Sequence, residues 1–235
     1  MLALVFLWPL AASVIASFAR DGQWTLANYD TVRRLYAQDV AYTIGVAAAG
    51  TVLTFLVAIP ACGWLRINAW GPVEFLLKVP LFVPFVVVGH ALRVFWSPYL
   101  PGVSSSWAGI AGALAWKHVG LAALLLLGAF RATDESYLEA ARQFGAGTLQ
   151  LTRHILVPMA GPALAVTVIL IFSSMLASFS IPLMMGRGGG PQMLMIDVYY
   201  RFGQHGDFAT ASALGVVAYL LATGAALVYM RRLTR

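Results

Sequence analysis

The chain has 235 residues, of which 60% are hydrophobic and only 10% are charged, and its mean hydropathy is +0.81. A soluble domain usually carries about 25% charged residues, so a water-soluble core of this size cannot bury so much apolar surface. The composition therefore predicts an integral membrane protein. The net charge of +6 does not indicate nucleic-acid binding, because the basic residues are dispersed and mostly flank apolar runs. The single cysteine, Cys62, lies in an apolar run and is expected to be a packing residue.

Six apolar segments are candidates for helices that cross a bilayer, which takes about 20 residues. They cover residues 2–18, 40–65, 75–95, 108–130, 164–185 and 208–230. Pro80 and Pro84 are expected to kink the third of them. A short interfacial helix is expected at MLMIDVYYRF, in the loop 186–207. The sequence thus predicts an all-α, polytopic membrane protein with about six transmembrane helices in a single domain, residues 1–235.

The first apolar segment has two interpretations. MLALVFLWPLAASVIASFA looks like the hydrophobic core of a secretory signal peptide, but no positive charge precedes the apolar run. We therefore favour a retained helix. Cleavage would leave the sidedness of the other spans unchanged.

Lysine and arginine favour the cytoplasmic side of membrane proteins. With the N-terminus inside, the inner segments hold Arg66, Lys78, Arg131, Arg142, Arg153, Arg231, Arg232 and Arg235. The outer loops hold Arg20, Arg33, Arg34, Arg187 and Arg201. Acidic residues balance the outer group: Asp21, Asp30, Asp39, Asp197 and Asp207. The asymmetry predicts that both termini and the charged segment 131–160 face the cytoplasm.

That charged segment, ESYLEAARQFGAGTLQLTRHILVP (135–158), interrupts the apolar chain. Apolar residues at helical spacing share one face of its first half: Tyr137, Leu138, Ala141 and Phe144. Gly145 and Gly147 are expected to end this helix. Thr148 is expected to cap a second short helix, which runs through Ile155 and ends before Pro158. The sequence predicts a hairpin of two short helices that either docks a partner protein or lies on the membrane surface.

The sequence lacks the common motifs for nucleotide binding, catalysis and metal binding. A phosphate-binding loop needs Gly-Lys-Ser/Thr, but the two lysines, Lys78 and Lys117, follow Leu77 and Trp116. HExxH, GxSxG and paired cysteines are absent, and four scattered histidines do not form a metal set. The chain is therefore expected to have no catalytic residue, no metal and no cofactor of its own. No predicted span carries Asp or Glu near its middle, which argues against a proton-coupled carrier.

The charged segment resembles the EAA signature of permease subunits of binding-protein-dependent ABC importers. The matching residues are Glu139, Ala140, Ala141, Gly145, Ile155, Val157 and Pro158. Val157 replaces the leucine usual in the family. TLANYDTV, YTIGVAAAGTVLTFLVAIPACGW, VPLFVPFVVVGHAL and FSIPLMMGRGGGPQ also look like the family, so the resemblance covers nearly the whole chain. The short N-terminus departs from many relatives.

The resemblance implies a type I importer permease in a bacterial or archaeal plasma membrane. Its coupling segment, residues 132–160, would dock on cytoplasmic ATPase subunits through Glu139, Ala140, Ala141, Gly145, Ile155 and Pro158. Two ATPase subunits would bind ATP and Mg²⁺, and a second permease, identical or paralogous, would complete the pathway. An extracytoplasmic solute-binding protein would deliver the solute, and Asp197, Tyr199, Tyr200 and Arg201 are candidates to meet it. The chain itself would not be an enzyme.

Four residues are candidates to line the pathway: Lys117, Ser174, Ser178 and Phe179. Ser174 and Ser178 share a helix face, but serines in membrane helices also bond to backbone carbonyls or pack small faces together. Lys117 would either contact the solute or have a structural role. The segment FSIPLMMGRGGGPQMLMIDVYY is more similar to polyamine, iron, thiamine and phosphonate permeases than to sugar or glycerol-phosphate permeases, which remain the alternative. Two alternative functions come from other classes of protein. One is an ion-coupled carrier or channel without ATPase partners, and the other is a membrane scaffold.

Overall fold

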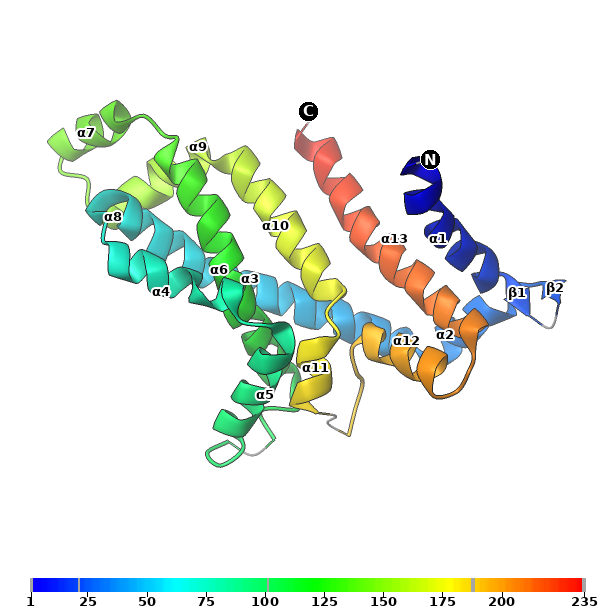
Figure 1. Cartoon of the computed structure of the whole chain (residues 1–235). Helices are drawn as coiled ribbons and strands as arrows, with labels where there is room; N and C mark the ends of the chain where they lie inside the picture. The colour runs from blue at the N-terminus through cyan, green and yellow to red at the C-terminus, as the bar shows by residue number, and fades with distance from the viewer. Residues whose placement is uncertain (1, 21, 101, 187–188, 234–235) are drawn as a thin grey trace.

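The computed structural model describes residues 2–20, 22–100, 102–186 and 189–233, and these form an almost wholly helical molecule (Figure 1). The first half contains α1 Leu2–Ser17, α2 Ala27–Leu35, α3 Ala37–Asn68, α4 Gly71–Phe82, α5 Phe85–Trp96 and α6 Trp107–Arg131. The second half contains α7 Glu135–Gln143, α8 Thr148–Leu151, a π-helical turn Thr152–Leu156, α9 Val157–Met159, α10 Gly161–Leu176, α11 Ser180–Met185, α12 Leu194–Gly203 and α13 Phe208–Leu233. Asp21, Arg187 and Arg235, used above in the charge argument, lie outside the described residues, as do the side chains of Arg231 and Arg232.

Small residues bring α3 and α6 together to form the centre of the molecule. Ala47 and Ala58 of α3 and Ala122 of α6 are fully buried in one hydrophobic core. Close backbone approach through small side chains is how membrane helices gain contact, since lipid supplies no hydrophobic drive between them. Cys62 is also fully buried, and its Sγ atom lies 3.8 Å from the carbonyl oxygen of Ala123. This confirms the prediction that the cysteine packs in the core.

The segment predicted as one kinked span over 75–95 is sharply broken. The segment is divided between α4 and α5, whose axes differ in direction by 104°. Pro84 stands at the N-cap of α5, and Val83 before it is extended, with φ −77° and ψ 127°. A residue that precedes proline is forced out of the helical region, which accounts for the break. Pro80 lies inside α4 and does not end it.

The predicted span over 164–185 is not one continuous helix. Helix α10 ends at Leu176 and α11 begins at Ser180, with Ala177 closing α10 by donating its amide to Ser173. Among the described residues, α3 and α6 are long and apolar enough to cross a bilayer alone. Two bent pairs, α4 with α5 and Thr148–Met159 with α10, bring the number of spans to at most four by this measure. The predicted number of six therefore stays a prediction.

Helices α2 and α12 pack against the start of α13. Strands β1 Ala19–Arg20 and β2 Gln23–Trp24 form a small antiparallel hairpin in which Ala19 pairs with Trp24. Val32 of α2, Leu194 of α12 and Leu214 of α13 form a second, smaller core. Helix α12 confirms the short helix predicted within the loop 186–207.

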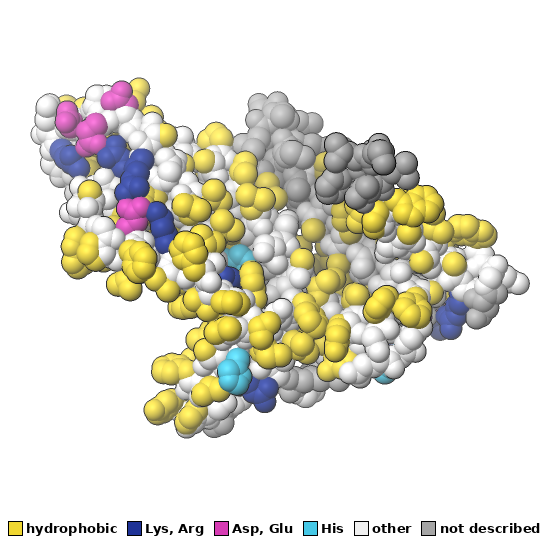
Figure 2. All heavy atoms as spheres, viewed as in Figure 1, with side chains coloured by type: hydrophobic (Ala, Val, Ile, Leu, Met, Phe, Trp, Pro, Cys, Tyr) yellow, Lys and Arg dark blue, Asp and Glu magenta, His cyan; other side chains and the backbone are white. Residues whose placement is uncertain are grey.

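Charged side chains gather at one end of the molecule. Figure 2 shows acidic and basic groups together over α7 and the adjoining ends of α4 and α6, above a broad apolar surface. The start of α1 and the end of α13 lie toward the same side as α7 in Figure 1. The prediction that both termini face the cytoplasm stays a prediction.

Candidate functional site

The charged segment folds as a hairpin of residues 134–159, hereafter the hairpin, which projects at one end of the molecule (Figure 1). Its first arm is α7, which Asp134 caps by accepting a hydrogen bond of 2.9 Å from the amide of Ser136. That bond keeps the pKa of the Asp134 carboxyl below its usual range, because it favours the charged form. The negative cap also complements the positive N-terminal end of the helix dipole.

Gly145 ends the first arm, as predicted. Its φ is +82°, a region that residues with a Cβ atom rarely adopt. The amide of Gly145 donates to Arg142, and the amide of Ala146 donates to Ala141. This pair of bonds is the Schellman pattern, which satisfies the last carbonyls of a helix.

The second arm differs from the prediction in two respects. Thr148 is its first helical residue, and Gly147 is the cap, with its amide donating at 2.9 Å to Oε1 of Gln150. The arm does not end before Pro158 but continues through it to Met159, after a π-helical turn. A proline inside a helix removes one hydrogen bond of the ladder, and a wider π turn directly before it accommodates the change in pairing.

The apolar residues of the hairpin point in two directions. Leu138 is fully buried and Ala141 packs against the core, but Tyr137 and Phe144 are exposed. The prediction that these four side chains share one face is therefore wrong. Phe144 is 92% exposed at the turn, and Leu149 beside it in the second arm is 72% exposed.

The residues of the EAA signature are distributed over both surfaces of the hairpin. Glu139, Ala140, Gly145 and Pro158 are exposed, whereas Ala141 and Ile155 are half-buried. A shallow groove of about 380 Å³ runs between the arms and includes Phe144, Gly145 and Ile155. Among the exposed members, Gly145 lies beside Phe144 in this groove.

Both arms are attached to the last turns of α3. Arg66 donates to the carbonyls of Phe130 and Thr133 at 3.0 and 3.1 Å, and its Nη2 atom lies 2.7 Å from Oε2 of Glu135 in α7. Thr152 of the second arm packs directly on Gly63, where an added Cβ would stand 2.8 Å from the Thr152 Cβ. Arg66 entered the sequence argument only as one charge among several, and Gly63 gave no signal there.

Lys117 lies at the break between α4 and α5. Its ammonium group donates to three carbonyls, those of Pro80, Leu81 and Val83, at 2.8, 3.0 and 2.6 Å. The last carbonyls of a helix lack partners within it, and a cation there also complements the helix dipole. Lys117 is 6% exposed and lies 4.7 Å from the ring centre of Phe85. These contacts favour the structural interpretation, while the predicted contact with solute stays a prediction.

Next to it, His118 joins α6 to α10. Its Nδ1 atom lies 2.8 Å from the carbonyl of Leu114, and its Nε2 atom lies 3.0 Å from Oγ of Ser174. A carbonyl only accepts, so Nδ1 carries a proton, and in the neutral ring Nε2 accepts from the Ser174 hydroxyl. Ser174 is exposed, so this polar pair reaches the surface of the helix bundle.

The other two pathway candidates lie apart from this pair. Ser178 is 6% exposed, and its Oγ atom has no hydrogen-bond partner among the described residues. Phe179 is half-buried, with its ring centre 5.1 Å from that of Tyr199 in α12. The structure thus bonds Ser174 to His118, the residue that follows Lys117 in α6, whereas Phe179 contacts Tyr199.

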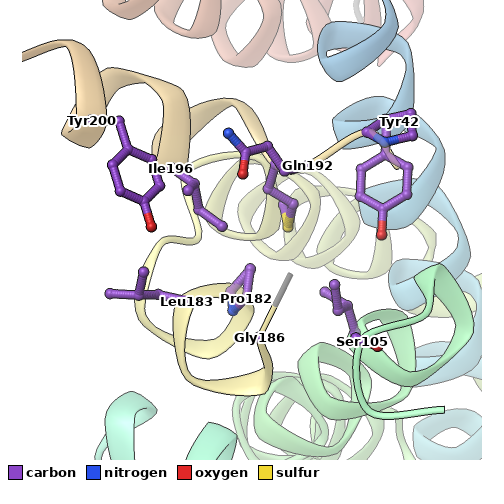
Figure 3. Close-up of a pocket in the computed structure, with 11 residues that line it drawn as sticks. Tyr42, Ser105, Pro182, Leu183, Gly186, Gln192, Ile196 and Tyr200 are labelled. Carbon is purple, nitrogen blue, oxygen red and sulfur yellow. The ribbon is translucent and has the colours of Figure 1, made fainter. Parts of the chain in front are cut away.

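Figure 3 shows a small cavity lined by residues of α3, α11 and α12. Tyr42, Pro182, Gln192 and Tyr200 are among the residues that line it, and its volume is about 50 Å³. Such a volume holds a few water molecules. It is too small for an organic solute, for which pockets of roughly 300 Å³ or more are usual.

The sequence pattern of the binding-protein-dependent transport system inner membrane component family matches residues 71–235. The chain therefore belongs to this family of membrane permease components. This confirms the resemblance carried by the EAA residues, and with it the prediction that the chain is a permease component rather than an enzyme.

Three curated relatives illustrate the range of the family. The chain is 29% identical to the thiamine transport system permease protein of Brucella abortus over 99% of its own length and 46% of the relative. It is 26% identical to the trehalose/maltose permease of Thermococcus litoralis over 71% of its length and 63% of the relative. It is 33% identical to the ferric transport permease of Actinobacillus pleuropneumoniae over 58% of its length and 22% of the relative. The chain thus spans about half the length, or less, of most of these relatives.

Solved structures confirm the fold. The inward-facing MetNI methionine ABC transporter matches with a TM-score of 0.71 at 18% identity, over 86% of this chain and 95% of that one. A bacterial alginate ABC transporter, in complex with an alginate pentasaccharide-bound periplasmic protein, matches with a TM-score of 0.69 at 16% identity, over 99% and 91%. The architecture is that of a type I ABC importer permease.

Proposed function

We propose that the chain is the membrane permease subunit of an ATP-driven importer. It forms half of a solute pathway with a second permease, identical or paralogous, and works with two ATPase subunits and an extracytoplasmic solute-binding protein. ATP and Mg²⁺ bind to the ATPase subunits. Membership of the permease family and the likeness to complete importers support this proposal.

The exposed apolar surface of the hairpin is the observation that carries the proposal. Phe144, Leu149 and Tyr137 are 92%, 72% and 55% exposed on an element that is otherwise polar. Apolar side chains that a polar surface surrounds mark protein-binding sites, and aromatic residues are frequent anchors of such interfaces. We infer that Phe144 inserts into a groove of the ATPase, with Glu139 and Ala140 at its rim.

The hairpin, and with it both termini, then faces the cytoplasm. The ion pairs around the hairpin place Arg66, Arg131 and Arg142 at this end. An excess of arginine and lysine at one end of a membrane protein is typical of the cytoplasmic side.

The solute belongs to one of two groups. Thiamine and iron permeases among the relatives support the first, which also includes polyamines and phosphonates. The trehalose/maltose relative supports a sugar as the second. An ion-coupled carrier or channel, or a scaffold, would need no ATPase partner, and so the same experiment separates them from the importer.

The test is association with the ATPase encoded beside this chain, measured by co-purification from membranes. Phe144→Ala is expected to weaken association by about tenfold, the usual effect of removing an aromatic anchor. Tyr99→Ala is the matched control, because Tyr99 is also an exposed aromatic residue, at 75%, but follows α5 at the other end of the molecule. Failure of the unaltered chain to retain any ATPase would refute the importer.

A further inference from the structure

We infer that Arg66 is the positioning residue through which the hairpin moves the transmembrane core. This inference rests on the proposed function and extends it. The hairpin is where an ATPase would act, and α3 with α6 is the central helix pair. The Arg66 guanidinium group forms a direct connection between these parts.

Arg66 holds three elements at once. It belongs to the last turn of α3 and donates to the carbonyl of Phe130 in α6, to that of Thr133, and to the carboxylate of Glu135 in α7. Its side chain is only 15% exposed. Charge-assisted bonds that are shielded from water are stronger and less screened than those on an open surface.

The chemistry of this junction requires arginine. Its planar group directs several N–H bonds in a fixed fork, whereas lysine offers a single flexible ammonium group. Here Nε and Nη2 are aimed at different elements. A displacement of α7 at Glu135 is therefore transmitted to the ends of α6 and α3 together.

The second arm meets the same part of α3. Gly63 lies one turn before Arg66, and the side chain of Thr152 fills the space beside it. Both arms of the hairpin therefore rest on the last two turns of α3. Because α3 and α6 are packed through small residues along their length, a push at this point moves them as one body.

A neighbouring ion pair supplies a control. Glu74 of α4 accepts from Arg131 at the end of α6, at 2.5 Å, and from Lys78 at 2.6 Å. This cluster lies at the same end of the helices and joins two of them, but no hydrogen bond or ion pair described for it reaches α7. If any ion pair at this end could couple the hairpin to the core, loss of the Glu74 cluster would have the same effect as loss of the Arg66–Glu135 pair.

The experiment uses the chain assembled with its ATPase in lipid nanodiscs, with ATP and vanadate as the probe. Hydrogen exchange is measured for α7 and for the last turns of α3. In the unaltered complex, nucleotide is expected to change exchange in both places by about fivefold or more, which is a usual size for coupling between sites. In Glu135→Gln, which leaves the carbonyl bonds of Arg66 intact, α7 is expected to respond and the end of α3 to change less than twofold.

Three comparisons make the result decisive. Arg66→Ala combined with Glu135→Gln is expected to behave as Arg66→Ala alone, because the two substitutions remove the same link, the Arg66–Glu135 ion pair. Glu74→Gln is expected to respond as the unaltered complex does.

Arg142→Ala removes the other partner of Glu135, at 3.3 Å, and keeps Arg66 paired. If it reproduces the loss seen with Glu135→Gln, Arg142 and not Arg66 carries the coupling, and the inference is overturned.

Failure of the inference and failure of the proposed function have different signatures. If nucleotide changes nothing in α7 of the unaltered complex, the hairpin does not couple to the ATPase, and the proposed function fails. If α7 and α3 both respond in Glu135→Gln as they do in the unaltered complex, only the role of Arg66 is refuted.

Discussion

The side chain of Thr152 lies against the backbone of Gly63, in the space that a Cβ atom on residue 63 would take. An added Cβ there would stand 2.8 Å from the Cβ of Thr152, closer than real carbon contacts allow. Gly63→Ala therefore forces the second arm of the hairpin away from α3. Overpacking of this kind costs about 1–3 kcal/mol, and we expect a lower unfolding temperature in detergent together with weaker ATP-driven uptake.

Gly45→Ala is the control for this change. Gly45 lies in the same helix, and nothing stands within 4 Å of its potential Cβ. Alanine is favoured over glycine in a helix by roughly 0.5–1 kcal/mol, so this variant should be at least as stable as the unaltered chain. Equal stability of the two variants would show that Gly63 is not a contact point.

Lys117→Met tests the role of the buried ammonium group. The substitution leaves the carbonyls of Pro80, Leu81 and Val83 without their donor at the break between α4 and α5. Hydrogen bonds to charged groups contribute about 1.5–3 kcal/mol each, and we expect a loss of at least about 2 kcal/mol in stability. Thermal unfolding in detergent measures it.

Lys78→Met serves as the comparison, because Lys78 makes a single ion pair with Glu74, which retains Arg131. A loss under about 1 kcal/mol is expected there. If Lys117→Met is equally mild but abolishes uptake, the lysine contacts solute and does not stabilise the break.

The sequence predicts some breaks in this fold and not others. Pro84 reveals the end of α4, because proline restricts the residue before it. The break after Leu176 has no such signal: Ala177, Ser178 and Phe179 suit a helix that continues. In a uniformly apolar segment, periodicity does not distinguish a buried face from a lipid-facing one, so tertiary packing alone decides where the helix ends.

The hairpin and its surroundings likewise combine features that the sequence predicts with features that it does not. Gly145 is predictable, because a turn with positive φ favours glycine. The roles of Arg66 and Lys117 are not predictable from sequence. Apart from the Glu135 carboxylate that pairs with Arg66, their hydrogen-bond partners are backbone carbonyls of residues 34 to 67 positions away in the chain. Every residue has a backbone carbonyl, so the sequence does not show which carbonyls accept these bonds.

Gly145 and Gly147 provide a test of the turn. Gly145 has φ +82°, whereas Gly147 has φ −79°, which any residue adopts. Gly145→Ala should cost about 1–2 kcal/mol locally, because a Cβ disfavours the left-handed region, and Gly147→Ala should cost little. ATPase co-purification is expected to fall only for the first. Equal loss for both would mean that the ATPase contacts the glycines themselves.

The sidedness of the hairpin can be tested with single cysteines. Cys62 is fully buried, so a Cys62→Ser background is expected to fold. Phe144→Cys should react with a membrane-impermeant maleimide only from the cytoplasmic side, and Gln204→Cys, exposed after α12, only from the outer side. Reaction of both from one side would contradict the predicted topology.

Ser174 and Leu170 distinguish a water-filled pathway from a lipid-facing surface. Both are exposed on α10, one helical turn apart, and Ser174 is bonded to His118. A thiol reacts as the thiolate, which forms readily in water but not in hydrocarbon. If Ser174 lines the pathway, Ser174→Cys in the assembled importer should react with a polar maleimide at a rate that changes when ATP and vanadate are added. Leu170→Cys should remain unreactive in both conditions, and equal, slow labelling at both positions would place Ser174 in lipid and remove it from the pathway.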